Sequence, residues 1–121
     1  MKYLAALTCV LALYCGVLLP GASAKLHKDN GYNVSWASWY GPGLYGNRMG
    51  CGGRLTTSTW GVAHKSLPCG THVRMCYTRC VTVTVVDRGP YIAGREFDVT
   101  FPVKSAIGMP SVGKIRWWRL S

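Results

Sequence analysis

The segment 83–100 constrains the fold more than any other part of this chain. It begins with a β-branched, strand-like run and turns at Gly89-Pro90 soon after Asp87. A second acid, Asp98, follows eleven residues after the first, inside another strand-like run. The chain has four acidic residues against 14 Lys and Arg, so half of its acids lie at strand ends around one loop. We expect two carboxylates facing a cleft on a cationic scaffold, an arrangement suited to work on a polymer outside the cell.

Residues 1–24 have the layout of a secretory signal peptide. Lys2 precedes a long apolar stretch, a Pro-Gly pair at 20–21 interrupts it, and Ala-Ser-Ala at 22–24 is a cleavage sequence. A transmembrane anchor is the alternative, although the apolar stretch is slightly short for a span. We therefore predict a protein secreted to the cell envelope or the extracellular space. Its membrane contact would be limited to this segment before cleavage.

Cleavage after residue 24 leaves 97 of the 121 residues, enough for one small domain. We expect a flexible leader at 25–33 and the domain at 34–121. Without Lys2 the chain keeps 13 basic and 4 acidic side chains, a net charge of +9 that attracts anionic partners. Export argues against nucleic acid, so we expect an anionic wall polymer, a membrane surface or an acidic polysaccharide as the partner of a monomer.

Four cysteines remain in the mature chain, and we expect them to form two disulfides, because an even count is typical of small exported domains. Three pairings are possible. We favour Cys51–Cys69 and Cys76–Cys80, the second of which closes a tight hairpin. A zinc site built from His72 and three of these cysteines is the alternative, but the spacing is irregular and the compartment oxidising. We expect no metal and no cofactor.

The rest of the pattern predicts a compact all-β barrel with one short helix. A glycine-rich loop at 41–53 follows the first strand. Thr100 is expected to cap a helix that has Pro102 in its first turn and stops at Gly108. Trp117 and Trp118 must face opposite sides of the last strand. The strands are expected at 34–40, 72–77, 80–86, 96–99 and 115–120.

Four separated motifs resemble the rare lipoprotein A family. They are Ala-Ser-Trp-Tyr-Gly-Pro-Gly at 37–43, Gly-Val-Ala-His-Lys-Ser-Leu-Pro-Cys-Gly-Thr at 61–71, Val-Asp-Arg-Gly-Pro-Tyr at 86–91 and Gly-Arg-Glu-Phe-Asp-Val-Thr at 94–100. Their order and spacing agree over roughly residues 34–120. The resemblance implies a six-stranded double-psi β-barrel, here stapled by disulfides, a fold shared with expansins and barwin-type proteins.

Enzymes of that family are lytic transglycosylases, which cut the glycan strands of peptidoglycan. One acid protonates the leaving oxygen, and the C6 hydroxyl of the sugar attacks the anomeric carbon to form a 1,6-anhydromuramoyl end. A single acid/base therefore suffices. The resemblance implies catalytic roles for Asp87, Asp98 and His64. The sequence departs from the family at Gly53 and Thr56, where catalytic members carry acids.

Aromatic residues beside glycine turns are candidates for stacking on sugar rings: Tyr40, Trp60 and Tyr91. Arg88 joins them as a substrate-binding candidate because it follows the first acid.

Each site candidate also has a structural alternative. Asp87 would cap its turn by accepting N–H bonds from Gly89 or beyond. Asp98 would pair with Arg88 or Arg95, since a buried acid needs a partner. His64 would be a satisfied histidine of the barrel.

Three functions stay open. We favour an exported peptidoglycan lytic transglycosylase. A non-catalytic, expansin-like module that binds or loosens wall glycans is the second, and Gly53 favours it. A small secreted protease inhibitor of the same fold is the third, although an inhibitor needs a protruding loop and not a carboxylate in a groove.

Overall fold

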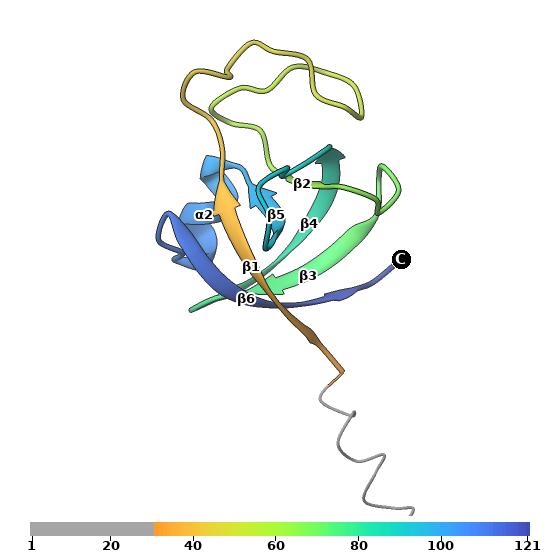
Figure 1. The fold of residues 1–121 in the computed structure, drawn as a ribbon, viewed down its shortest axis with the longest axis vertical. Coiled ribbons are helices and arrows are strands. Elements are labelled where there is room, and N and C mark those ends of the chain that lie inside the picture. Colours follow the sequence, from red (N-terminus) through yellow and green to blue (C-terminus); the bar gives the residue numbers. More distant parts are fainter. Residues whose placement is uncertain (1–30) are drawn as a thin grey trace, which may run out of the picture. The chain divides into compact units, whose positions relative to one another are not determined.

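Six strands and one helix make up residues 31–121, the part of the chain that the computed structural model describes (Figure 1). The predicted signal peptide and most of the predicted leader lie outside the described residues. No helix within the described part is both long and apolar enough to cross a membrane. The elements are β1 (Asn33–Trp39), β2 (Val62–His64), β3 (His72–Cys76), β4 (Cys80–Asp87), β5 (Arg95–Val99), α2 (Phe101–Ile107) and β6 (Val112–Arg119).

The strands close into a barrel in the order β1-β5-β2-β4-β3-β6. The pairs β1–β5 and β2–β4 are parallel, and the other described pairs are antiparallel. Closure leaves no unpaired sheet edge. The all-β barrel with one short helix that the sequence predicts is confirmed.

The core lies inside this barrel and follows from the period-2 alternation of the strands. Val83 and Val85 of β4 and Val73 and Met75 of β3 point inward and are buried, and Phe97 of β5 is the largest fully buried side chain. Each such side chain contributes roughly 1.5–3 kcal/mol through burial. The buried face of β4 therefore consists of alternate residues of its β-branched run.

Each expected strand differs from its predicted boundaries at one end or both, and one strand was not predicted. β1 begins at Asn33, inside the predicted leader, and β6 begins at Val112, earlier than expected. β2 has only three residues and was not predicted, because the segment 55–63 is weakly patterned. It forms through pairing with the distant strands β4 and β5.

The helix α2 begins and ends at the predicted residues. Thr100 is its N-cap residue, Pro102 lies in the first turn, and Gly108 terminates the helix in a left-handed conformation with φ 73°, which glycine tolerates best. The Thr100 side chain, however, makes no capping hydrogen bond. Its hydroxyl instead accepts the N–H of Gly61 at 3.3 Å and ties the start of the helix to β2.

Both disulfides have the favoured pairing, Cys51–Cys69 and Cys76–Cys80. Their sulfurs are therefore not available to the zinc alternative.

The paired tryptophans of β6 also follow the prediction. Trp117 packs edge-on against Phe97, with 4.9 Å between ring centroids, and its indole N–H donates to the Ser35 hydroxyl. Trp118 is half-buried on the outer face, where it lies opposite Arg74 of β3.

Candidate active site

The two predicted acids lie in one row across four adjacent strands. The register pairs Ser38 of β1 with Asp98 of β5, Asp98 with Ala63 of β2, and Ala63 with Asp87 of β4. Since neighbouring strands are about 4.8 Å apart, the Cα atoms of the two acids are separated by roughly 9–10 Å. Ala63, whose side chain is a single methyl group, is the residue of β2 that pairs with both acids.

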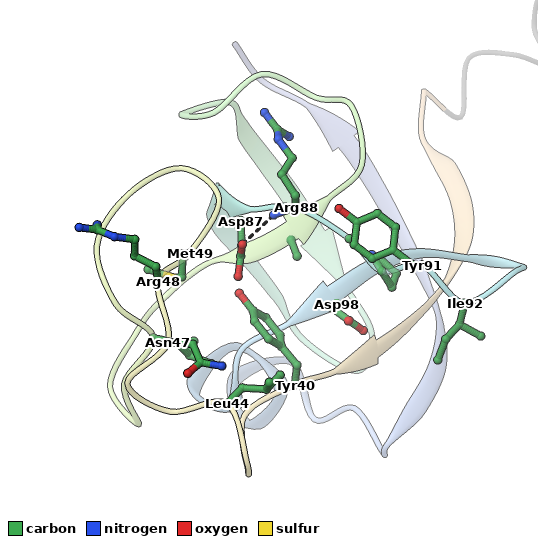
Figure 2. A pocket seen from close by; sticks show the side chains of 14 residues that line it. Tyr40, Leu44, Asn47, Arg48, Met49, Asp87, Arg88, Tyr91, Ile92 and Asp98 are labelled. Atoms are coloured by element: carbon green, nitrogen blue, oxygen red, sulfur yellow. Dashed lines mark hydrogen bonds between the residues drawn. The ribbon is translucent and has the colours of Figure 1, made fainter.

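Above this row is a cavity of about 310 Å³, which we call the groove (Figure 2). Asp87 and Asp98 both line it. The long loop after β1 forms one wall, and the turn after β4 brings Tyr91 to the rim, where the ring is 79% exposed. The remaining lining side chains named in Figure 2 are Tyr40, Leu44, Asn47, Arg48, Met49, Arg88 and Ile92.

Asp87 is held by backbone donors. Its Oδ1 accepts the N–H of Gly50 at 2.6 Å and the N–H of Arg88 at 2.8 Å. Asp87 therefore accepts backbone N–H bonds as its structural alternative predicts, but the donors are Gly50 and Arg88 and not Gly89 or a later residue. Gly50 precedes Cys51, whose disulfide and whose N–H bond to the carbonyl of Val86 hold the long loop against β4. The loop is therefore part of the site.

Asp98 has a hydroxyl partner, since Ser38 donates its O–H to the Asp98 Oδ1. The predicted pairing of Asp98 with Arg88 or Arg95 is wrong. The ion pair found within residues 31–121 joins His64 and Glu96.

Arg88 points its guanidinium away from Asp87 (Figure 2). The Nη1 group donates to the carbonyl oxygens of His64 at 3.0 Å and Leu67 at 2.6 Å, and Nη2 contacts the Cys69 sulfur. The guanidinium thus anchors the segment after β2, while the rest of Arg88 lines the groove.

Tyr40 points its hydroxyl toward the Asp87 carboxylate (Figure 2). Within residues 31–121 this oxygen is the one buried side-chain polar atom of a non-exposed residue without a hydrogen-bond partner. Burial raises the pKa of Tyr40 above its ordinary value, and the charges of Asp87 and Asp98 raise it further. Tyr40 therefore stays neutral and offers an O–H donor to a molecule in the groove.

His64 lies outside this groove, and the structure does not bring it together with the two acids. Its Nδ1 accepts the N–H groups of Ser66 at 3.1 Å and Leu67 at 2.9 Å, so its Nε2 carries the proton and donates to Glu96 at 2.7 Å. The ring is buried and packs against Phe97 at 4.8 Å. These contacts match the structural alternative, a satisfied histidine of the barrel.

Trp60 also lies outside the groove, where its indole N–H donates to the carbonyl of Thr82 at 3.0 Å. Gly53, at the position of the family glutamate, has φ +78°, a conformation that a side chain strains. Thr56 is exposed in a turn and bonds to Ser58 and Thr59.

Sequence reasoning missed Ser38 and the amide of Gly50. Ser38 stands two residues before Tyr40, and alternate residues of a strand share one face. That spacing was a usable signal. Nothing local to Gly50 indicates that its N–H meets a carboxylate 37 residues away.

A closed six-stranded barrel of parallel and antiparallel strands with one short helix places this protein in the double-psi β-barrel class. The chain belongs to the lytic transglycolase family, which matches residues 33–117. The resemblance to the rare lipoprotein A family is thereby confirmed.

Similar curated proteins are named as endolytic peptidoglycan transglycosylases. The chain is 41% identical over 80 residues to the probable endolytic peptidoglycan transglycosylase RlpA of Synechocystis. The aligned part is 64% of this chain and 25% of that relative. It is 37% identical over 87 residues to the corresponding protein of Aquifex aeolicus, covering 69% and 38%. The Campylobacter jejuni protein is 38% identical over 80 residues, covering 64% and 29%. The chain thus spans less than two fifths of these relatives.

Among solved structures, the barrel is similar to the apo expansin of Clavibacter michiganensis. The TM-score is 0.59 at 19% identity, covering 74% of this chain and 50% of the expansin. A mutant of that expansin in complex with cellohexaose gives a TM-score of 0.55 at 17% identity, with the same coverage. These likenesses concern the fold.

Proposed function

We propose that this protein is exported to the cell envelope or the extracellular space and cleaves peptidoglycan glycan strands as a lytic transglycosylase. The observation that carries the proposal is the groove itself. Two carboxylates lie in one row beneath it, and the buried Tyr40 hydroxyl has no partner within the described residues. The names of the curated relatives support peptidoglycan as the substrate.

The partners of the two acids suggest different roles for them. The donors to Asp87 named above are backbone amides, which can only donate and therefore favour a charged carboxylate. The Ser38 hydroxyl can donate to Asp98 or accept from it, so Asp98 keeps this bond in both protonation states. Asp98 is therefore the general acid/base. Asp87 stabilises the positive charge that develops at the anomeric carbon.

The reaction then needs no water. The proton of Asp98 moves to the glycosidic oxygen while the bond from that oxygen to the anomeric carbon breaks. The C6 hydroxyl oxygen of the same sugar bonds to the anomeric carbon, and its proton returns to the Asp98 carboxylate. The product is a 1,6-anhydromuramoyl end. Because one acid/base completes the cycle, a second positioned acid at Gly53 is not required.

Tyr40 and Tyr91 would hold the substrate. The neutral Tyr40 hydroxyl donates to a sugar oxygen beside Asp87, and the exposed Tyr91 ring stacks on a sugar face at the rim. We assign no direct substrate contact to His64 or Trp60, because neither lines the groove.

The test is mass spectrometry of purified glycan strands incubated with the protein from residue 25 onward. We expect 1,6-anhydromuramoyl ends from the native sequence and a loss of about 10²–10⁴-fold in rate for Asp98→Asn. Glu96→Gln is the matched control, since it neutralises a carboxylate of the same strand outside the groove. Equal losses in Asp98→Asn and Glu96→Gln would contradict the assigned role of Asp98.

Glycan binding without cleavage is the second candidate function, and Gly53 is the observation that favours it. No new ends, with the strands still pulled down by the native protein, would establish such a module. Absence of both cleavage and binding would overturn both wall functions and make protease inhibition the next assay.

A further inference from the structure

The outer face of the barrel carries a row of cations and tryptophans that the groove does not use. We call it the cationic strip. It begins beside the groove on β5 and β1 and runs around the barrel over β6 to β3, and none of its members lines the groove. Its members are Arg95, Trp36, Lys114, Arg116, Trp118 and Arg74.

The strand register places these side chains beside one another. Trp36 pairs with Lys114, and Trp118 pairs with Arg74. Arg95 lies beside Trp36 at an irregularity in the β1–β5 register, and the two residues line one shallow pocket. Directly paired residues project from the same face of a sheet. The residues that alternate with them, among them Ile115 and Met75, are buried in the core. The strip therefore faces outward.

The cations of the strip contact an aromatic ring, a carbonyl oxygen and a hydroxyl group. The Lys114 Nζ lies 5.4 Å from the centre of the Trp36 ring, a cation–π contact. Arg116 donates to the carbonyl of Tyr77, and Arg74 donates to the Thr82 hydroxyl. None of the four cations has an ion-pair partner within residues 31–121.

Two acids of the described chain, Asp87 and Asp98, face the groove. Glu96 lies at the end of the strip, where it lines a shallow pocket with Trp36 and Arg95 and is engaged by His64. Four adjacent strands span only about 15 Å, so neighbouring cations of the strip lie within about one Debye length of each other. Their mutual repulsion is relieved when an anionic partner binds.

We infer that the cationic strip binds an anionic glycan polymer. Carboxylates of the polymer would meet the four cations, and sugar faces would stack on Trp36, which is 47% exposed, and on Trp118. The mixture of aromatic rings and cations in the strip favours an anionic glycan polymer as the ligand, because such a polymer presents both apolar sugar faces and carboxylates. The inference concerns binding alone and holds whether or not the groove cleaves glycans.

The test is a binding titration with polygalacturonate, which has a carboxylate on each sugar, using the protein from residue 25 onward. We expect Lys114→Gln/Arg116→Gln to weaken binding about tenfold, since each exposed charge contact contributes up to about 1 kcal/mol. Arg54→Gln/Lys104→Gln removes the same charge from outside the strip and should have little effect. Methyl-esterified polygalacturonate, whose sugars carry no charge, should bind weakly.

Tryptophan variants give a second readout that does not depend on charge. Trp36→Ala should remove the binding that survives high salt, whereas Trp60→Ala, a control of similar exposure outside the strip, should not. The readout is binding alone, which separates this inference from catalysis.

Three outcomes would overturn the inference. The first is equal weakening in the strip and control charge pairs, which would mean that net charge alone attracts the polymer. The second is equal binding of the charged and esterified polymers. The third is tighter binding to phosphatidylglycerol vesicles than to polygalacturonate, lost in the strip variants, which would make the strip a membrane surface.

Discussion

The Cys51–Cys69 disulfide should contribute more to stability than Cys76–Cys80 and should also support the groove. We consider the variants Cys51→Ala/Cys69→Ala and Cys76→Ala/Cys80→Ala. The sequence separations are 18 and 4 residues. In the chain-entropy model, closing these loops stabilises the fold by about 3 and about 2 kcal/mol, respectively. The longer loop therefore has the larger effect.

The assay is equilibrium unfolding in guanidinium chloride under oxidising conditions. For a domain of this size, a loss of about 3 kcal/mol lowers the melting temperature by roughly 12–24 °C. A larger loss of unfolding free energy in the Cys76/Cys80 variant than in the Cys51/Cys69 variant would refute the loop-entropy reasoning.

The same bond should also control the groove, because Cys51 is adjacent to Gly50, which donates to Asp87. Releasing the loop removes that donor, so Asp87→Asn should weaken glycan binding less in the Cys51→Ala/Cys69→Ala background than in the native one. This is a double-mutant cycle. Identical effects of Asp87→Asn in both backgrounds would mean that the disulfide does not position the carboxylate.

Two further substitutions separate stability from function. Tyr40→Phe deletes a buried hydroxyl without a partner in the described chain, so the free energy of unfolding should rise by about 1 kcal/mol while glycan binding weakens. The folded state raises the pKa of Tyr40 above the unfolded value of 10.0, so Tyr40 ionises more readily in the unfolded protein. The free energy of unfolding should therefore be unaffected by this ionisation below pH 10 and should fall as the pH rises further. Denaturant titrations should show a smaller alkaline loss in Tyr40→Phe. Gly61→Ala should destabilise the barrel by about 1–3 kcal/mol, since its Cβ would lie 2.6 Å from a Val86 methyl and 3.0 Å from the Thr84 carbonyl oxygen. Unfolding midpoints unchanged from the native protein would contradict that packing.

The sequence by itself determined the features that depend on neighbours in the chain. The alternation of Val83 and Val85 predicts the buried face of β4, because the side chains of a strand alternate with a period of two. Gly108 predicts the end of α2, because glycine tolerates the positive φ of the turn that follows the helix. The even count of cysteines and the family motifs indicated the disulfides and the barrel.

Tertiary structure alone decided β2, a strand of three residues whose own pattern is weak. Its ladder bonds come from β4 and β5, so it forms only when those strands are in place. Tertiary contact also decided the partner of the Thr100 hydroxyl, which accepts the N–H of Gly61 although Thr100 occupies the N-cap position that the sequence predicts.

The site shows the same division. The sequence named Asp87, Asp98 and Tyr40, because carboxylates at strand ends and an aromatic beside a glycine turn are visible in the chain. It did not show that His64 faces away from them or that Ser38 meets Asp98 across 60 residues. Those contacts depend on barrel closure and strand register, which bring together residues that no local pattern connects.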